Sequence, residues 1–244
     1  MRSVALANQK GGVGKTTTAV HLAHGLSLSG SRVALFDLDP QGNASLAVQA
    51  MVDETSHGTG AFAPMSRWGE RLWLLPSPGA ARNVDRDEEL DTDRLVELAD
   101  QLAADLDWLL VDCPPRMDAW GWAGLRLCAE VVVPVQAEFF AMQGLSHMMQ
   151  TLAQAQREFP GRAGLLGVLV TMLDLREPVA REVLANLREN LGSDLLDTAI
   201  LRDAQLVEAS SHGTTVFDYS LCSKGARSYG ELVREVLHGR TAAR

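Results

Sequence analysis

Short apolar runs alternate along the chain with segments in which apolar residues recur at helical spacing. The runs predict strands at 4–7, 32–36, 72–75, 108–111, 131–135 and 165–171. The intervening segments predict helices at 16–29, 91–106, 144–159 and 178–191, and a last helix at 224–237. Because the strands are apolar throughout rather than at alternate positions, helices should cover both faces of their sheet. The order predicts an α/β protein with a doubly wound, mostly parallel sheet.

Two stretches do not fit this alternation. Residues 51–71 are rich in Gly, Ser, Thr and Pro without a clear period, which predicts a loop or irregular insertion. Residues 83–93 are strongly acidic and predict a solvated helix start. Because no repeat, linker or low-complexity tract interrupts the chain, we expect one domain over residues 1–244.

Composition narrows the class of protein. Hydrophobic residues make up 46% of the 244 residues, and no apolar run approaches the roughly 20 residues of a membrane span. No signal-peptide pattern precedes the first strand. Three cysteines, Cys113, Cys128 and Cys222, lack metal-binding spacing and indicate reduced, buried thiols. We expect a cytoplasmic protein.

The net charge of −9 argues against a surface that is basic throughout. Residues 202–244 carry six Lys or Arg against five acids, so the first 201 residues hold a net charge of −10. An anion-binding face is therefore expected toward the C-terminal segment, although these charges also suit ordinary solvated helix faces.

The residues after the first strand form a glycine-rich loop. Residues 8–17 read Asn-Gln-Lys-Gly-Gly-Val-Gly-Lys-Thr-Thr and end in the Gly-Lys-Thr of a P-loop. Glycine lets successive N–H groups point into one concavity, and the next helix adds its dipole, so phosphate is the expected ligand. We expect Lys15 at the β- and γ-phosphates and the Thr16 hydroxyl on Mg²⁺.

Carboxylates follow two later strands, at the sheet edge where α/β proteins bind ligands. Asp37 and Asp39 stand in Phe-Asp-Leu-Asp-Pro-Gln-Gly-Asn, and Asp112 ends the run Trp-Leu-Leu-Val-Asp. A buried acid such as Asp112 is costly unless it meets a cation, and Mg²⁺ is the expected partner. Hydrolysis also needs a polar group that positions water, which the loop with Asp37 and Asp39 supplies.

These strings resemble the ParA/MinD superfamily of ATPases, and the ParA and Soj partitioning proteins in particular. Residues 10–17 are similar to the deviant Walker A loop, residues 37–43 to the switch motif Asp-x-Asp-Pro-Gln-Gly-Asn, and residues 108–115 to the Walker B strand. The stretches 133–145, 171–176 and 223–226 also match, so the resemblance runs from residue 1 to about 238.

The resemblance implies a P-loop ATP hydrolase with ATP and Mg²⁺ as cofactors. It implies that Lys10 reaches the partner subunit's nucleotide in a sandwich dimer, that Lys15 holds phosphate and that Asp39 orients the attacking water. The implied metal ligands are Thr16, Asp37 and Asp112. The implied nucleotide contacts are Lys10, Gly11, Gly12, Val13, Gly14, Lys15, Thr16, Thr17 and, near the base, Thr171.

A ParA-like protein would form an ATP-dependent homodimer that binds DNA non-specifically and positions a plasmid, a chromosome or another large cargo. A ParB-like partner with a basic N-terminal segment would stimulate hydrolysis, and the ATP-bound form would associate with the nucleoid. Gln205 and Cys222 stand where the family has arginines, which should weaken DNA binding. The implied DNA-binding residues are Arg202, Lys224, Arg227 and Arg234.

Three alternatives stay open. A MinD-like membrane-cycling protein needs an amphipathic tail, whereas residues 231–244 carry only a short apolar stripe that suits packing on the sheet. A metabolic enzyme with the same loop needs cluster cysteines or a second-substrate site, and the sequence offers neither convincingly. An orphan ATPase that positions a protein cargo would bind DNA only weakly.

Overall fold

The computed structural model describes residues 1–57, 65–77 and 92–238, and within these ranges nine strands form one sheet. The strands follow the order β3-β4-β5-β2-β6-β1-β7-β8-β9 across the sheet. Their bounds are β1 Arg2–Leu6, β2 Val33–Asp37, β3 Asp53–His57, β4 Ser66–Gly69, β5 Leu72–Leu75, β6 Trp108–Asp112, β7 Glu130–Gln136, β8 Gly164–Leu173 and β9 Leu195–Leu201.

All pairs from β5 across to β9 are parallel, while β3 and β4 pair in antiparallel fashion at one edge. The predicted doubly wound, mostly parallel sheet is thus confirmed. The central strands are buried at almost every position because helices cover both faces.

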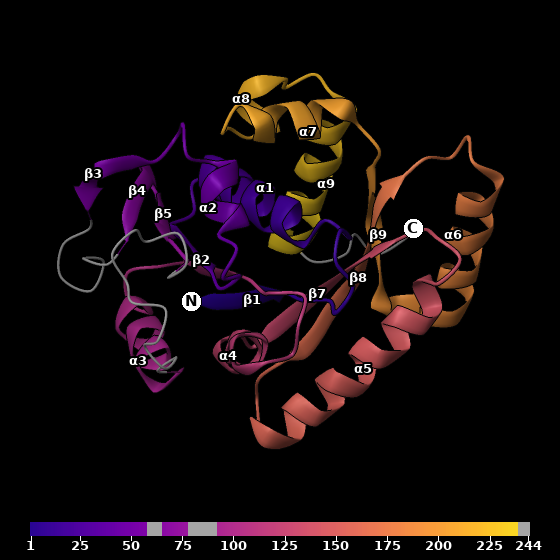
Figure 1. Cartoon of the computed structure of the whole chain (residues 1–244), viewed down its shortest axis with the longest axis horizontal. Coiled ribbons are helices and arrows are strands. Elements are labelled where there is room, and N and C mark those ends of the chain that lie inside the picture. The colour runs from indigo at the N-terminus through magenta and orange to yellow at the C-terminus, as the bar shows by residue number, and fades with distance from the viewer. Residues whose placement is uncertain (58–64, 78–91, 239–244) are drawn as a thin grey trace.

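The helices divide between the two faces of the sheet, as Figure 1 shows. Helices α1, α2, α7, α8 and α9 lie on one side, and α3, α4, α5 and α6 lie on the other. Their bounds are α1 Lys15–Leu28, α2 Asn43–Ala47, α3 Thr92–Leu102, α4 Ala119–Leu127, α5 Ala141–Glu158, α6 Pro178–Leu191, α7 Ala204–Ser211, α8 Val216–Tyr219 and α9 Lys224–His238.

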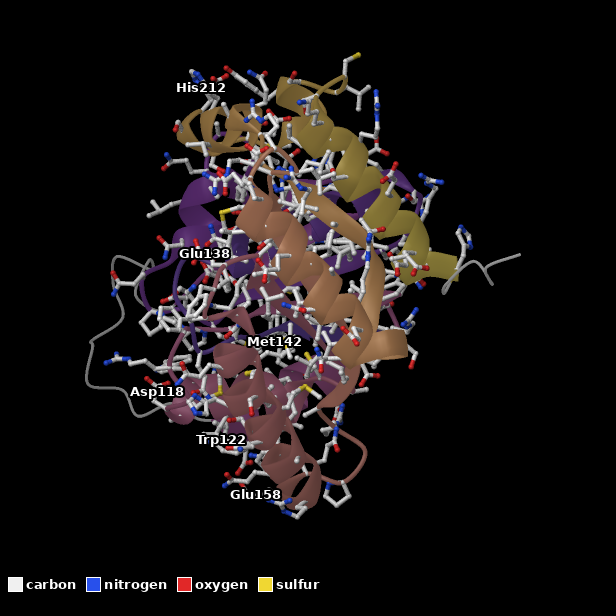
Figure 2. The ribbon with its side chains drawn as sticks, turned by 90° about the vertical axis from the view of Figure 1, so that its right-hand side faces the viewer. Asp118, Trp122, Glu138, Met142, Glu158 and His212 are labelled. Atoms are coloured by element: carbon white, nitrogen blue, oxygen red, sulfur yellow. The ribbon has the colours of Figure 1, made fainter. Side chains whose placement is uncertain are left out.

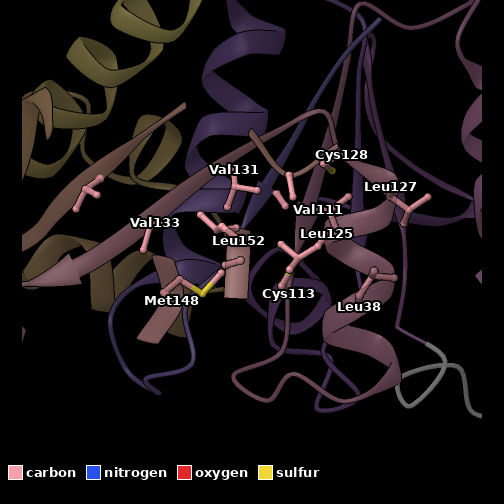
Figure 3. Packing of buried hydrophobic residues seen from close by; sticks show 14 of the residues in the cluster. Leu38, Val111, Cys113, Leu125, Leu127, Cys128, Val131, Val133, Met148 and Leu152 are labelled. Atoms are coloured by element: carbon pink, nitrogen blue, oxygen red, sulfur yellow. The ribbon is translucent and has the colours of Figure 1, made fainter. Parts of the chain in front are cut away.

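Each face of the sheet has its own apolar core. The core under α4 and α5 contains Leu125, Val133 and Met148, and its interdigitated side chains are drawn in Figure 3. The core under α1 and α9 is tight enough that a Cβ on Gly25 would lie 2.5 Å from a Val233 methyl carbon. Burial of the α9 apolar stripe at Leu232, Val233 and Val236 confirms that it packs on the body of the protein.

The structure differs from the sequence predictions in the segment 51–71 and at Cys222. The predicted loop at 51–71 contains β3 and β4. Backbone pairing of β3 with β4 and of β4 with β5, rather than an apolar pattern, holds these short edge strands. The predicted acidic helix start at 83–93 lies mainly outside the described residues, and α3 begins at Thr92. Cys113 and Cys128 are buried as expected, but Cys222 is exposed.

The sequence also left β9, α2, α4, α7 and α8 unassigned. The longest of these is α4, Ala119–Leu127. Helix α4 contains two glycines, and Gly124 lies so close to Cys113 that a Cβ would come within 2.4 Å of its Sγ. Its helical state therefore depends on tertiary contact more than on residue propensity.

Candidate functional site

The P-loop connects β1 to α1 and is shaped by backbone geometry. Gly12 and Gly14 have φ values of 75° and 86°, a conformation that glycine adopts without steric cost. Gly14 is also the N-cap of α1 and contributes no side-chain hydrogen bond, and the first turn of α1 holds no acid. The first N–H groups of α1 are therefore left facing a prospective anion.

Buried Asn8 holds the start of this loop. Its Nδ2 donates to the Pro134 carbonyl of β7 at 2.7 Å, and its Oδ1 accepts from the Lys10 N–H at 3.0 Å. The far side of the loop rests on β8, where the Thr171 hydroxyl lies 2.8 Å from the Val13 carbonyl. The loop is thus supported from two neighbouring strands before any ligand arrives.

Lys15 is 7% exposed, and its Nζ donates to the Lys10 carbonyl at 3.2 Å. Burial lowers the pKa of Lys15, while the nearby Asp112 opposes that shift. A cation withdrawn from water in this way has a strong electrostatic preference for an anionic ligand.

The sheet places Asp37 and Asp112 side by side. They are direct partners in the parallel register of β2 and β6, and both are at most 1% exposed. Asp37 Oδ2 accepts from the Ser45 N–H and hydroxyl at 2.9 and 2.7 Å. Asp37 Oδ1 and both Asp112 carboxylate oxygens have no hydrogen-bond partner among the described residues.

The electrostatics of this pair favour a bound cation. Burial raises the pKa of Asp112 to about 8, the charge of Asp37 adds to the rise, and Thr16 and Lys15 oppose it. Burial likewise raises the pKa of Asp37. Mg²⁺ fits these residues because it binds proteins through one or two carboxylates and keeps several waters. Within the described ranges no group of three His, Cys, Asp or Glu gathers, so a metal cage made only of such side chains is not present there.

Asp39 lies two residues beyond β2, at the edge of the same site. Its Oδ1 accepts from the Gln41 N–H at 3.0 Å, and its carbonyl accepts from the Gly42 N–H at 2.8 Å. The turn fixes a carboxylate that is 7% exposed, and one face of it borders the open cavity.

These elements surround a cavity of about 670 Å³, a size that suits a nucleotide. Of the residues predicted from the sequence, Gly11, Gly12, Gly14, Lys15, Thr16, Thr17 and Asp39 line it. Asp37, Asp112 and Val13 lie behind this lining, in the buried layer under the loop.

Thr171 lies elsewhere than the sequence indicated, and Lys10 lies outside the cavity of its own subunit. Thr171, expected near the base, is 2% exposed and contacts the underside of the loop; its neighbour Met172 lines the cavity instead. Met172 has φ of 51°, an uncommon conformation for a non-glycine residue. Lys10 lines a separate, smaller pocket with Gln9, Phe140, Gln143, Gly144 and His147.

Sequence reasoning missed much of the opposite wall of the cavity. The sequence motifs already contained six of the additional lining residues, namely Pro40, Gln41, Asn43, Pro114, Pro115 and Met172. The other five, Val20, Ala47, Arg116, Asp118 and Ser210, stand in no matched motif. The additional lining residues are Val20, Pro40, Gln41, Asn43, Ala47, Pro114, Pro115, Arg116, Asp118, Met172 and Ser210.

The candidate DNA-binding residues are exposed at the end of the sheet near α7 and α9. Arg202, Lys224, Arg227 and Arg234 form no ion pair with any described residue. Three of them recur on α9 at spacings that place them on one helical face, which Glu231 shares. Gln205 Nε2 donates to Glu208 Oε2 at 2.9 Å, so an acid occupies the place beside it.

The fold and the arrangement of loop, lysine and paired carboxylates define a P-loop nucleotide-binding protein. The model of the CobQ/CobB/MinD/ParA nucleotide binding domain matches residues 4–216. The chromosome-partitioning ATPase Soj of Thermus thermophilus is 37% identical over 254 residues, which cover 97% of this chain and 96% of that protein. The chain belongs to the ParA/Soj family of partitioning ATPases, as its motifs predicted.

Two further comparisons agree with this assignment. The chromosome partitioning protein ParA of Caulobacter vibrioides is 33% identical, over 97% of this chain and 94% of its own length. Cobyrinic acid a,c-diamide synthase of Mycobacterium smegmatis, solved with an ATP analogue and magnesium, has a TM-score of 0.76 and 28% identity, and the match covers 98% and 97% of the two chains. No helix in the described part of this chain is long and apolar enough to cross a bilayer.

Proposed function

We propose that this protein binds ATP and Mg²⁺ in the 670 Å³ cavity and hydrolyses ATP slowly until a partner protein stimulates it. The observation that carries the proposal is the buried pair Asp37 and Asp112 beneath a P-loop whose N–H groups face the cavity. Three of the four carboxylate oxygens of this pair have no hydrogen-bond partner among the described residues. Thr16, Asp37 and Asp112 would hold the metal, which supplies positive charge to the phosphate oxygens.

The remaining steps belong to side chains of this chain. Lys15 and the loop N–H groups bind the β- and γ-phosphates, where buried donors act in a low dielectric. Asp39, held by Gln41 at the cavity edge, orients the water for attack on the terminal phosphorus. Loss of the carboxylate should slow hydrolysis without releasing the nucleotide.

The position of Lys10 supports dimerisation. Its side chain is outside its own cavity, 39% exposed and ion-paired with Glu138, so it is available to a nucleotide in a facing subunit. We infer an ATP-dependent sandwich dimer in which each Lys10 leaves Glu138 for the partner's phosphates. Lys10 would then exchange the Glu138 carboxylate for a phosphate of the partner's nucleotide. Formation of the dimer would therefore depend on bound ATP.

We propose that the dimer binds DNA non-specifically and uses it as the surface on which it positions its cargo. The four unpaired cations Arg202, Lys224, Arg227 and Arg234 are too few on one subunit of net charge −9 for firm binding. A dimer doubles the phosphates neutralised and so steepens the salt dependence. The ATP-bound form would then reside on the nucleoid, and a ParB-like partner with a basic N-terminal segment would release it by stimulating hydrolysis.

A DNA-retention assay tests this function. The protein is passed over immobilised duplex DNA with ATP and Mg²⁺, with ADP and Mg²⁺, or without nucleotide, over a salt series. We expect retention only with ATP, lost steeply as salt rises, and equal for unrelated DNA sequences. Absence of ATP-dependent retention at low salt would reject the DNA-carrier function, and liposome binding by the same protein would then favour the MinD-like alternative.

A further inference from the structure

Arg116 stands on the wall of the nucleotide cavity and has no place in the function described so far. Among the described residues that line the cavity, only Lys15 and Arg116 carry a positive charge. Lys15 belongs to the P-loop side of the cavity, whereas Arg116 follows the Walker B strand through Pro114 and Pro115 and lines the same cavity. A second cation therefore borders the same space from another element.

The backbone around Arg116 is fixed. Two preceding prolines restrict the chain, and Asp118 caps α4 by accepting from the Trp120 and Gly121 N–H groups at 3.2 and 3.3 Å. The Arg116 carbonyl rests against Gly121 so closely that a Cβ there would lie 2.3 Å from its oxygen. These contacts hold the loop against the start of α4.

The side chain of Arg116, in contrast, is only loosely held. It is 84% exposed, and its Nε lies 3.7 Å from Asp118 Oδ2, beyond hydrogen-bond distance. Asp118 therefore uses one oxygen to cap α4 and offers the other to a weak, exposed pair that contributes little. Figure 2 shows Asp118 along the same edge of the molecule as Glu138, the carboxylate that holds Lys10.

Guanidinium matches the geometry of phosphate oxygens and can form two parallel hydrogen bonds with them. An arginine that meets the terminal phosphate also stabilises the charge that develops during phosphoryl transfer. We propose that Arg116 leaves Asp118 when ATP binds and holds the γ-phosphate in its own subunit, as a residue that distinguishes ATP from ADP. This inference rests on the proposed nucleotide function of the cavity.

The test compares affinities for two nucleotides. Binding of Mg²⁺ with a non-hydrolysable ATP analogue, and separately with ADP, is titrated by calorimetry in a Lys10→Ala background confirmed as monomeric by light scattering. We expect Arg116→Ala to weaken binding of the ATP analogue about tenfold and to leave ADP within about twofold. Arg116→Lys should recover part of the loss, because it keeps the charge but not the planar fork.

Two further variants sharpen the comparison. Asp118→Asn keeps an N-cap for α4 but removes the competing charge, so it should strengthen binding of the analogue. Arg188→Ala, an exposed arginine of α6 away from the cavity, is the matched control and should change neither affinity.

The possible results distinguish failure of nucleotide binding from failure of the role proposed for Arg116. If the parent protein binds neither nucleotide, the proposed function itself fails. If it binds both and Arg116→Ala leaves the ratio of the two affinities unchanged, only the role of Arg116 is overturned. A loss that appears in the dimer-forming protein but not in the Lys10→Ala background would overturn the assignment to its own subunit and place Arg116 at the partner's nucleotide.

Discussion

Lys10 Nζ donates to Glu138 Oε2 at 2.8 Å, across 128 residues of sequence. Both side chains are substantially exposed, so the pair itself adds little to stability. The pair instead determines where the Lys10 side chain lies. Asn8 fixes the Lys10 backbone, and Glu138 holds the Lys10 ammonium outside the nucleotide cavity. In the proposed dimer, contact of Lys10 with the second subunit's nucleotide would compete directly with Glu138.

Glu138→Gln should promote ATP-dependent dimerisation. The amide cannot pair with the Lys10 charge, so the cost of releasing Lys10 falls, and the midpoint protein concentration for dimer formation should fall roughly threefold to tenfold. Light scattering with ATP and Mg²⁺ measures the midpoint. Glu182→Gln, an exposed glutamate of α6, is the matched control. A weaker dimer in Glu138→Gln would instead make Glu138 part of the interface.

Asp39→Asn should bind ATP and dimerise but hydrolyse at least about a hundredfold more slowly. Asparagine keeps an acceptor for the Gln41 N–H, so the turn survives while the charge that orients water is lost. Single-turnover release of phosphate is the measurement, with Asp100→Asn on α3 as the control. Loss of ATP affinity in Asp39→Asn would assign the residue to the metal site rather than to hydrolysis.

Asp112→Asn should stabilise the protein without nucleotide by up to about 4 kcal/mol at pH 7. The folded-state pKa of Asp112 is raised to about 8, so the folded protein binds the extra proton between about pH 4 and pH 8. The wild type therefore loses stability as pH rises through that window, and the variant does not.

Urea unfolding at several pH values measures this difference. Addition of ATP and Mg²⁺ should reverse the order, because the variant lacks a metal ligand and gains less from the bound nucleotide. An unchanged or lower stability of nucleotide-free Asp112→Asn would argue that the unpartnered carboxylate is not a source of strain in this fold.

His21 should make the fold sensitive to acid. Its Nδ1 donates to the Thr17 carbonyl at 2.7 Å, its Nε2 accepts from the Val216 N–H at 3.0 Å, and its ring stacks on Tyr229. Burial, aided by the charge of His24, lowers the pKa of His21 to about 4, although the Thr17 carbonyl opposes the shift. Protonation would remove the acceptor that holds the start of α8.

The unfolded chain binds this proton below about pH 6.5, whereas the folded protein does so only near pH 4. The stabilising contribution is therefore complete above pH 6.5 and declines by up to about 3 kcal/mol as pH falls toward 4. Chemical unfolding of wild type and His21→Gln across this range isolates the effect from Asp112, whose raised pKa has the opposite sign. Parallel pH profiles for the two proteins would exclude His21 as the source.

The sequence predicted the parts of this site that depend on local pattern. The P-loop, Asp39 and Asp112 follow from short motifs at strand ends, and the sheet class follows from six apolar runs. The Lys10–Glu138 pair could not be foreseen from spacing, because it depends on β1 lying next to β7. The prediction that Thr171 lies near the nucleotide base was wrong. Its place under Val13 depends on the register of β8 against β7, which the sequence does not reveal. Arg116 lies in no phosphate-binding motif, and only its place in the lining of the cavity identifies it as a candidate.

DNA retention should depend on α9. Lys224, Arg227 and Arg234 share one face of this helix, and Arg227→Glu with Arg234→Glu reverses two of its three positive charges. In a dimer with up to eight contacts the logarithm of affinity should fall with the logarithm of salt at a slope near −7, and the double variant should lose retention altogether. Arg157→Glu with Arg188→Glu, which makes the same change of net charge on α5 and α6, should retain DNA with a near-normal slope.

Gln205→Arg should strengthen DNA retention, in contrast to the double variant of α9. Gln205 bonds Glu208, which Tyr219 OH also approaches at 3.2 Å, so the wild type presents an acid where a cation would favour phosphate. Arginine should neutralise Glu208 and add a contact, which raises affinity at moderate salt and steepens the slope by about one unit per added contact. Light scattering with ATP confirms that each variant still dimerises. If the α9 pair and the control pair lose retention equally, general charge rather than this helix face governs binding to DNA.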